Sequence, residues 1–544
     1  MTLKKTLALL AAASTSFAMV ACSDSSSSSN SAGSSSNADG NSSAASGDGN
    51  YVLVNGSEPQ NPLIPANTNE TGGGRIIDHI YSGLVYYDGE GAAHYEVAES
   101  IEANDTNTEF TVKLKDWKFS DGSPVTANSF VDAWNYAVAN AQLGSYFFEP
   151  IKGYAEEGVD KLEGLEVIDD KTFKITLDSP AADFPDRLGY SAYFPLPESA
   201  FDDMDGFGAK PVSNGPYILQ EWGHNQHALL VPNPEYDGPR AAQNEGVDIV
   251  FYPTQDAAYA DLLSGNLDVL DAIPDSAFSV FESDLGDRAV NQPAAVFQSF
   301  TIPESLDHFS GEEGKLRRQA ISHAIDRKEI TDTIFEGTRT PASDFSSPVV
   351  PGWSADVPGN EVLEFDPAKA KELWAQADAI SEWSTPKFEI AYNSDGGHQA
   401  WVDAVTNQLR NNLGIDAVGA PYPDFKSLRD EVTNRTITTA FRTGWQADYP
   451  GMGNFLAALY GTGAGSNDGD YSNPEFDAKI READAADTSE DATAKFVEAQ
   501  TILFEDLPAI PTWYSNVVGG YSENVDNVTF SWKSQPVLNE ITKK

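Results

Sequence analysis

The chain has 544 residues, of which 40% are hydrophobic and 11% aromatic, so it is too long for a single hydrophobic core and ordinary in composition for a soluble globular protein. Its 83 acidic residues outnumber 34 basic ones and give a formal net charge of −49, which argues against nucleic acid or anionic lipid as a partner. The single cysteine, Cys22, excludes a disulfide framework and a cysteine-based metal site.

Residues 1–21 have the pattern of a secretory signal peptide. The charged pair Lys4-Lys5 is followed by an apolar stretch, residues 6–19, that is too short to span a bilayer permanently. Met19-Val20-Ala21-Cys22 resembles a bacterial lipobox, although Met stands where Leu is usual. The resemblance implies cleavage before Cys22 and lipidation of that residue, which would anchor the protein to the membrane without spanning it. An ordinary secreted protein with a stray cysteine is the alternative.

Residues 22–50 consist almost entirely of Ser, Gly, Asn, Ala and Asp. Such a segment cannot bury enough apolar surface to fold, so we expect a flexible tether. The folded body then begins at Tyr51 with a short run that reads as a buried strand ended by a proline-rich turn.

The first half of the body predicts a mixture of strands and helices. Gly72-Gly73-Gly74 is expected at a helix entry and not in a phosphate loop, because no Gly-Lys-Ser/Thr sequence follows. His224 and His227 lie at an expected hairpin tip, which favours a solvated turn over a metal site. Apolar spacing and turn residues predict helices over 75–84, 127–140 and 259–263, and strands over 110–114, 173–177, 212–220 and 247–251.

The second half predicts an α/β unit followed by further helices. A strand over 388–393, a helix over 399–413 and a strand over 415–418 occur in the order that implies a parallel pair. Asp326 and Asp366 stand where they can cap helices, and Pro367 suits a first helical position. The remaining predicted elements are helices over 315–335 (hinged at 326), 367–377, 474–482 and 491–505, and a strand over 510–518.

The stretch Phe441–Leu456, FRTGWQADYPGMGNFL, concentrates charged and aromatic side chains between glycines. Pro450 and the glycines indicate a strand end and a loop, not a helix. Such a segment suits the wall of a binding site, although a strand end whose Trp445 fills the core and whose Asp448 caps a turn is the structural alternative.

The order of several motifs resembles that of the extracellular solute-binding proteins of peptide ABC importers, the oligopeptide- and dipeptide-binding group known as solute-binding protein family 5. The similarity extends from Tyr51 to the C-terminus, and each motif alone is weak. The motifs are GSEPQNPLIP, the run from Ala98 to Trp134 that contains WKFSDGSPVTANSF, SNGPYILQEW, NPEYDGP, LLSGNLDVL, RRQAISHAIDRKEI and GWQADYP.

This resemblance implies an α/β fold of the two-lobed periplasmic-binding-protein type (type II, large cluster C), with an extra subdomain in the first lobe. The implied first lobe combines residues 51–285 and 501–544, with the subdomain at about 85–205, and the second lobe spans 286–500. A hinged closure of the lobes would enclose the ligand. We expect no catalysis, no cofactor and no metal, and a monomer that delivers its ligand to ABC permease and ATPase subunits.

The resemblance also implies roles for individual residues. Asp448 matches an aspartate that holds the α-ammonium of an extended peptide, and Arg442 and His398 match basic residues that meet its carboxylate. Gly444 and Gln446 match positions whose backbone pairs with the peptide, Trp445 lies between them, and Tyr146 matches a tyrosine of the extra subdomain. A zwitterion in a closed cleft needs such fixed counter-charges. For Arg442 an internal ion pair, and for His398 a solvated helix entry, are the alternatives.

The chain departs from the family pattern at Gly451-Met452-Gly453, which we expect to make the loop roomier or more mobile and so to alter peptide preference. Relatives of this fold bind other solutes, so an oligosaccharide ligand stays open. An extracellular hydrolase is a third possibility, although no Gly-x-Ser-x-Gly elbow, zinc motif or cysteine nucleophile is present.

Overall fold

The computed structural model describes residues 50–68, 70–155, 158–394, 397–423 and 425–544. The predictions for the signal peptide, for Cys22 and for all but the last residue of the tether lie outside the described residues. The described residues fall in one compact unit, residues 48–544. No helix among them is long and apolar enough to cross a membrane.

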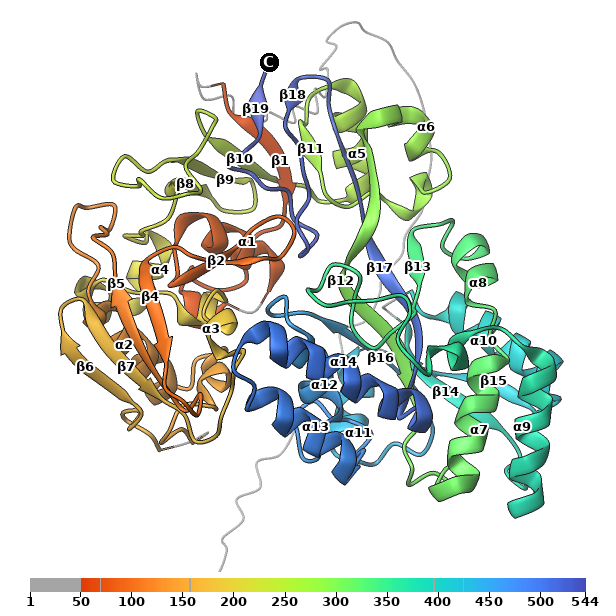
Figure 1. Ribbon diagram of the computed structural model, residues 1–544. Helices are drawn as coiled ribbons and strands as arrows, with labels where there is room; N and C mark the ends of the chain where they lie inside the picture. Colours follow the sequence, from red (N-terminus) through yellow and green to blue (C-terminus); the bar gives the residue numbers. More distant parts are fainter. Residues whose placement is uncertain (1–49, 69, 156–157, 395–396, 424) are drawn as a thin grey trace, which may run out of the picture. The chain divides into compact units, whose positions relative to one another are not determined.

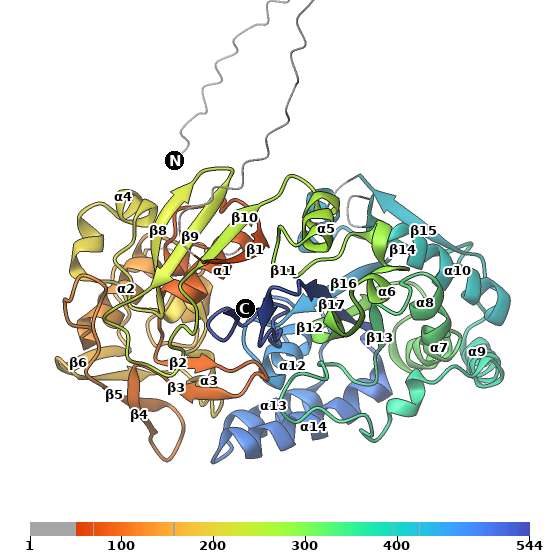
Figure 2. The same ribbon diagram turned by 90° about the horizontal axis from the view of Figure 1, so that it is seen from above.

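The centre of the fold is an 11-stranded mixed sheet with the order β15-β14-β16-β12-β17-β11-β1-β10-β9-β8, and β13 pairs with β17 beside this path (Figures 1 and 2). Strand β1 pairs parallel with β10 and β11, and β14 pairs parallel with β15 and β16. The strands are β1 (Val52–Gly56), β8 (Tyr217–Gly223), β9 (His227–Pro232), β10 (Val247–Phe251), β11 (Val269–Leu270), β12 (Ala289–Thr301), β13 (Arg339–Pro341), β14 (Phe388–Asn393), β15 (Ala417–Tyr422), β16 (Ala440–Gln446) and β17 (Ala509–Tyr521).

Two long antiparallel strands connect the two main hydrophobic clusters of the fold. Strands β12 and β17 have 13 residues each and pair along their length. Val517 of β17 belongs to the cluster around β1 and β10, and the partly buried Val290 of β12 packs against that cluster. Phe297 of β12 and Trp513 of β17 belong to the cluster around β14 and β16. Each long strand therefore contacts both clusters.

The first cluster also includes a smaller antiparallel sheet with the order β4-β5-β7-β6. Helix α2 covers it, and its N-cap residue Thr126 forms a capping box with Ser129. The α2 residue Trp134 is fully buried and packs edge-on against Phe173 of this sheet. The strands are β4 (Ala98–Ala103), β5 (Glu109–Leu114), β6 (Leu165–Asp169) and β7 (Thr172–Thr176); the short pairs are β2 (Val85–Tyr87) with β3 (Ala93–Tyr95), and β18 (Val525–Asp526) with β19 (Thr542–Lys543).

Helix boundaries in the second half follow the predicted caps. Asp326 accepts the backbone N–H of Glu329, and Asp366 caps the helix that Pro367 opens. Helix α10 ends before Gly414, whose φ of 76° is the left-handed conformation that glycine adopts at little cost. The helices are α1 (Thr71–Ile80), α2 (Ala127–Ala139), α3 (Phe184–Arg187), α4 (Met204–Ala209), α5 (Gln255–Ser264), α6 (Phe281–Leu285), α7 (Gly311–His323), α8 (Arg327–Thr333), α9 (Pro367–Ile380), α10 (Gln399–Leu413), α11 (Phe425–Thr433), α12 (Met452–Tyr460), α13 (Pro474–Asp484) and α14 (Ser489–Asp506).

Two local predictions are wrong. The stretch Phe441–Leu456 does not end as a loop, because helix α12 begins at Met452 and buries that side chain. Gly453 lies in the first turn of α12, where an added Cβ would meet an Asp183 carboxylate oxygen at 2.9 Å, so this segment is closely packed and not roomy. His227 is buried, and its Nδ1 lies 2.6 Å from Asp248 Oδ1, so only His224 of the hairpin pair is exposed.

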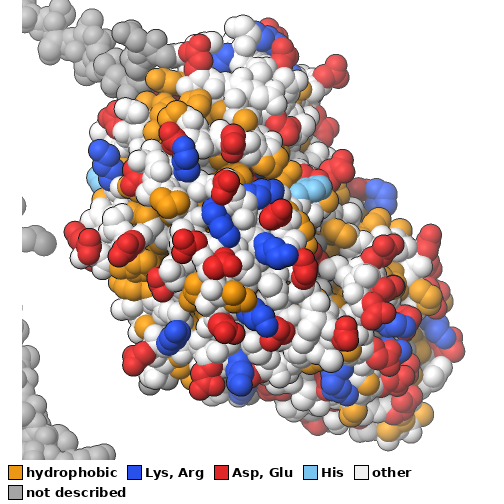
Figure 3. All heavy atoms as spheres, turned by 60° about the vertical axis from the view of Figure 1, so that its left-hand side comes forward, with side chains coloured by type: hydrophobic (Ala, Val, Ile, Leu, Met, Phe, Trp, Pro, Cys, Tyr) orange, Lys and Arg blue, Asp and Glu red, His pale blue; other side chains and the backbone are white. Residues whose placement is uncertain are grey.

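Acidic side chains do not gather in one patch on the face of the molecule shown in Figure 3. On the face shown in Figure 3, Asp and Glu side chains are scattered among Lys and Arg. This distribution agrees with a role of the negative charge in solubility.

Candidate functional site

Strand β16 has an open edge over most of its length. On one side it pairs antiparallel with β12 from Phe441 to Gln446. On the other side it pairs with β14 only at Ala440 and Phe441. The backbone from Arg442 to Gln446 therefore has no partner strand on the β14 side among the described residues.

The hydrogen-bond pattern shows which residues face this open edge. The Ala447 N–H donates to the Ala295 carbonyl at 2.9 Å, so this pair is hydrogen-bonded to β12. Hydrogen-bonded pairs alternate along an antiparallel ladder, so Trp445 and Thr443 also point their backbone groups at β12. Gly444 and Gln446 consequently direct N–H and C=O outward at the open edge, where both residues are exposed.

Asp448 lies just beyond the end of β16 and is held by Asn454 of α12. The Asn454 Nδ2 donates to Asp448 Oδ2 at 3.2 Å, and Asn454 Oδ1 accepts the Asp448 N–H at 3.0 Å. Burial raises the pKa of the Asp448 carboxyl, against the opposing effects of the Asn454 hydrogen bond and of the positive charge on Lys533. A partly buried carboxylate of this kind gains from a cationic partner.

The Asp448 carboxylate faces a cavity of about 200 Å³. Charged groups are prominent in its wall. His79 lies there too, and burial lowers its pKa to about 4, so it is uncharged at neutral pH. The charged and aromatic lining residues, besides His79, are Asp78, Tyr86, Tyr87, Asp88, Glu96, Tyr190, Phe194, Arg240, Asp448, Trp532, Lys533 and Glu540.

Tyr146 lies close enough to Asp448 for the carboxylate charge to act on its hydroxyl. Its ring packs in a tilted arrangement against Phe147 at a centroid distance of 4.4 Å, and Phe147 packs in the same way against Tyr190 at 4.1 Å. Burial and then the negative charge of Asp448 raise the pKa of both tyrosines. These rings form an aromatic wall beside the carboxylate, and 53% of Tyr146 is exposed.

The two predicted basic residues lie near the ends of β14 and α10. The Arg442 Nε donates to Asn393 Oδ1 at 2.8 Å, and Asn393 ends β14. His398 precedes α10, and its Nδ1 accepts the Trp401 indole N–H at 3.1 Å. Because β16 ends at Gln446, strand alternation does not place Arg442 and Asp448 on one face, and the residues that line the Asp448 cavity do not include Arg442.

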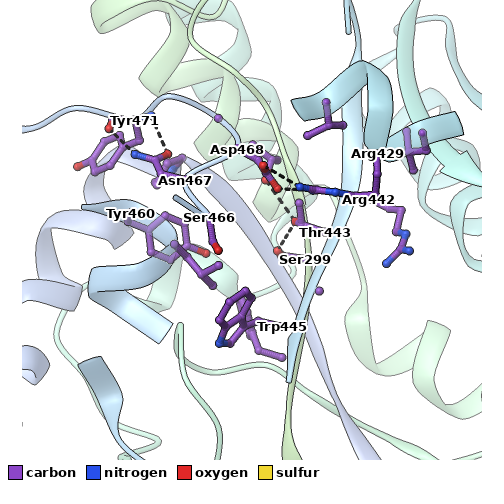
Figure 4. Close-up of a pocket in the computed structure, with 18 residues that line it drawn as sticks. Ser299, Arg429, Arg442, Thr443, Trp445, Tyr460, Ser466, Asn467, Asp468 and Tyr471 are labelled. Atoms are coloured by element: carbon purple, nitrogen blue, oxygen red, sulfur yellow. Dashed lines mark hydrogen bonds and ion pairs between the residues drawn. The ribbon is translucent and has the colours of Figure 1, made fainter. Parts of the chain in front are cut away.

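A second cavity, of about 230 Å³, lies against the face of β16 that carries Thr443 and Trp445 (Figure 4). Helix α11 and the segment that follows α12 complete its wall. The Arg429 Nη1 donates to Asp468 Oδ2 at 2.5 Å, and Asp468 also lies 3.7 Å from Arg435 Nη1. The polar and aromatic lining residues are Phe297, Ser299, Thr301, Arg429, Arg442, Thr443, Trp445, Tyr460, Ser466, Asn467, Asp468 and Tyr471.

The floor of this second cavity is a chain of three hydroxyl groups. Ser299 Oγ lies 2.7 Å from Thr443 Oγ1, which lies 3.2 Å from Thr301 Oγ1. The three hydroxyl groups have three hydrogens, and the two contacts among them use two. One O–H donor of this hydroxyl chain is therefore left for another acceptor. Ser299 and Thr301 are buried, which makes that donor costly to leave unused.

A third cavity, of about 450 Å³, borders Gln446 and the buried ion pair between Arg75 and Asp271. Its wall also includes Gly72, where an added Cβ would lie 2.7 Å from the Ser57 carbonyl oxygen. The triple glycine therefore allows a close backbone approach at the start of α1, as expected. No group of His, Cys, Asp and Glu suited to a metal occurs among the described residues.

Sequence reasoning missed two residues of this site. Asn454 positions Asp448, and the motif sequence contained it six residues downstream without a recognised role. Lys533 shares a cavity wall with Asp448 although 85 residues separate them in the chain. Only the three-dimensional structure brings these two charges together.

Comparison with known proteins places these features in a family. The model of the family described as "Bacterial extracellular solute-binding proteins, family 5 Middle" matches residues 92–467, which is more than half of the chain. The chain is 25% identical to the oligopeptide-binding protein OppA of Bacillus subtilis over 86% of this chain and 88% of OppA. It is 26% identical to YgiS of Escherichia coli, a probable deoxycholate-binding periplasmic protein, over 85% of this chain and 88% of YgiS.

The fold agrees with solved structures. The unliganded open form of the murein tripeptide-binding protein MppA aligns with a TM-score of 0.77 at 22% identity, covering 91% of this chain and 97% of MppA. The fold is thus the mixed α/β, two-lobed periplasmic-binding-protein type that the sequence predicted. The protein belongs to the bacterial extracellular solute-binding proteins of family 5.

Proposed function

We propose that this protein captures extracellular peptides and delivers them to the permease of an ABC importer, without catalysis. The observation that carries the proposal is the open edge of β16 next to a partly buried carboxylate. Gly444 and Gln446 offer outward backbone groups there, and Asp448 follows two residues later. An extended peptide can add to such an edge as a strand, which gives affinity that depends little on its sequence.

The proposed orientation follows from charge. The peptide α-ammonium meets Asp448 beside the Tyr146 ring, because an ammonium is stabilised both by the carboxylate and by aromatic faces. The carboxylate of the peptide lies toward Arg442 or His398, which are the matched basic residues. Arg442 already donates to Asn393, so the peptide would add to that contact.

Side chains of an added strand alternate between the two faces of the sheet. One set therefore points toward the cavity beside Trp445, and the other toward the cavity beside Gln446. Both cavities have polar as well as apolar walls, which is consistent with a site that accepts varied side chains. The names of relatives such as OppA and a dipeptide-binding protein of Bacillus subtilis support a peptide ligand.

Substitution of Asp448 tests this function. We expect Asp448→Asn to weaken binding of a free-amine peptide more than tenfold, because the α-ammonium loses its counter-charge. Isothermal titration calorimetry with a peptide and its N-acetylated form measures the effect. Equal affinity for the two forms in the unmodified protein would contradict the role of Asp448.

Other solutes and other activities are separable by experiment. Native mass spectrometry of co-purified ligand identifies a peptide, an oligosaccharide or a steroid acid by mass, and the deoxycholate-binding name of YgiS makes the last a useful comparison. Incubation with peptide and oligosaccharide mixtures tests for hydrolysis. Steady turnover would show an enzyme and overturn the proposal.

We also propose a lipid anchor at Cys22 on the extracellular face of the membrane, of the Gram-positive type, with residues 23–50 as the tether. The support is the lipobox-like sequence and the serine-rich composition that follows it. Cys22→Ala would release the protein into the medium, as fractionation and immunoblotting would show. Continued membrane retention of this variant would contradict the anchor.

In the proposed lobe division, residues 51–285 and 501–544, with a subdomain at about 85–205, form the first lobe, and residues 286–500 form the second. The first boundary lies just before β12, and the second lies in α14. After the second boundary, Trp513 and Tyr514 of β17 pack in the second hydrophobic cluster and Val517 packs in the first, which supports a return of the chain toward the first lobe. We propose that the protein acts as a monomer.

A further inference from the structure

One backbone residue connects Asp448 to a distant segment of the chain. Ala295 lies in β12, and its carbonyl accepts the N–H of Ala447 at 2.9 Å. The N–H of Ala295 donates to the carbonyl of Trp532, also at 2.9 Å. Asp448 follows Ala447 and Lys533 follows Trp532, so each charged residue comes directly after a residue that hydrogen-bonds to Ala295.

Lys533 is positioned by more than this backbone contact. Its Nζ lies 3.0 Å from Asp78 Oδ2 of α1 and 5.7 Å from the centre of the Tyr190 ring. The Trp532 ring packs edge-on against Tyr87 at 5.5 Å, and the backbone N–H of Trp532 donates to the Gly89 carbonyl. The Lys533 side chain is 25% exposed, so it lies in the cavity wall and not free in solvent.

The other cation of this cavity is already committed. Arg240 donates through Nε and Nη2 to both carboxylate oxygens of Glu96, at 2.9 and 3.0 Å. His79 is uncharged at neutral pH. Lys533 is therefore the cation whose charge acts on both Asp78 and Asp448. All three residues line the same cavity, and the proposed function places the α-ammonium of the peptide in that cavity.

We infer that Lys533 is a built-in competitor for the cationic end of the ligand: it partly balances Asp78 and Asp448 without the ligand, and so limits affinity for ammonium groups. The inference rests on the proposed function. An ammonium entering beside Asp448 meets the repulsion of Lys533 as well as the attraction of the carboxylate. Lys533 thus determines how strongly the site distinguishes a free amine from a neutral N-terminus.

Two variants of one ion pair test the inference because they act in opposite directions. Lys533→Gln removes the competing charge, and we expect a free-amine peptide to bind about fivefold more tightly, in line with the interaction of partly exposed charges. Asp78→Asn releases Lys533 toward Asp448, and we expect the same peptide to bind several-fold more weakly. The N-acetylated peptide should respond to neither change.

A purely structural role of the Lys533–Asp78 pair predicts something else, because both variants would then weaken binding of free and acetylated peptides alike. Lys543→Gln is a matched control, since Lys543 pairs with Asp268 at 2.7 Å, does not line the Asp448 cavity, and undergoes the same charge change. Calorimetric titration at low and high salt measures all four proteins. Thermal unfolding checks that each one folds.

The outcomes separate the inference from the proposed function. If the unmodified protein binds no peptide, or binds both peptide forms equally, the proposed function fails and the inference with it. If the unmodified protein prefers the free amine but Lys533→Gln does not raise that preference, only the inference is overturned. A rise with Lys533→Gln and a fall with Asp78→Asn establish the competitor.

Discussion

Asn454 contacts Asp448 through both ends of its carboxamide. The amide nitrogen donates to the Asp448 carboxylate, and the amide oxygen accepts both the Asp448 N–H and the Trp445 indole N–H, the latter at 2.9 Å. Asn454 is buried in the first turn of α12. One amide therefore fixes the carboxylate of Asp448 and the indole of Trp445, which line two different cavities.

We expect Asn454→Ala to weaken binding of a free-amine peptide about tenfold. The change leaves the Trp445 and Asp448 donors without their acceptor, which typically costs about 1–3 kcal/mol, and it frees the carboxylate to leave the cavity. Titration calorimetry measures the affinity. An affinity equal to that of the unmodified protein would show that Asp448 does not need this support.

Two glycines of the motif should respond in opposite ways to an added methyl group. At Gly444 a Cβ would meet nothing closer than 3.6 Å, and alanine restricts the unfolded chain, so we expect Gly444→Ala to keep or slightly raise stability. At Gly453 a Cβ would lie 2.9 Å from an Asp183 oxygen and 3.0 Å from the Phe496 ring, so Gly453→Ala should lower the stability of the protein. Calorimetric melting temperatures test the contrast, and equal shifts would contradict it.

Much of the fold was predictable because its signals are local. The β14–α10–β15 unit is encoded by its own apolar spacing and by Gly414, and its predicted parallel pairing is confirmed. The start of α12 was not predictable, because Gly451 and Gly453 indicate a turn when only the neighbouring sequence is considered. Gly453 instead leaves room for Asp183, which lies 270 positions earlier in the chain and which the window does not show to be a neighbour.

The candidate site likewise contains residues that could be predicted from local sequence and residues that could not. Asp448, Arg442 and Gly444 could be singled out because a contiguous motif contains them, and their proposed ligand contacts stay predictions. Lys533 could not be found, since its segment carries no recognisable motif and reaches the cavity through tertiary contacts such as those of Trp532 with Ala295 and of Lys533 with Asp78. Charges brought together by tertiary structure leave no spacing signal in the sequence.

The ion pair in the cavity beside Trp445 should influence which side chains it accepts. We expect Arg429→Met to shift preference toward peptides with Lys or Arg in that position, because Asp468 loses its closest cation while only 14% of its side chain is exposed. Competition among Ala-X-Ala peptides measures the preference. Arg435→Met is the control, since it leaves the Arg429–Asp468 contact intact and should change preference less.

The contact between α3 and the end of α13 should make stability depend on pH. Burial and then the neighbouring Asp183 raise the pKa of Asp484 to about 7. The Ala182 N–H also donates to the Asp484 carbonyl at 2.9 Å, so the carboxyl lies where two distant segments meet. A raised carboxyl pKa means that folding favours the neutral form, so this stabilisation is complete below the ordinary pKa near 4 and is lost as pH rises toward 7.

Asp484→Asn keeps a neutral side chain at every pH. We therefore expect it to raise the free energy of unfolding by about 2 kcal/mol at pH 8, allowing for partial solvent screening, and to change it little at pH 4.5. Urea unfolding across this range measures the difference. Asp487→Asn removes the same charge from an exposed neighbouring position and should show no such dependence. A constant gain from Asp484→Asn at all pH values would mean that packing, and not ionisation, explains the effect.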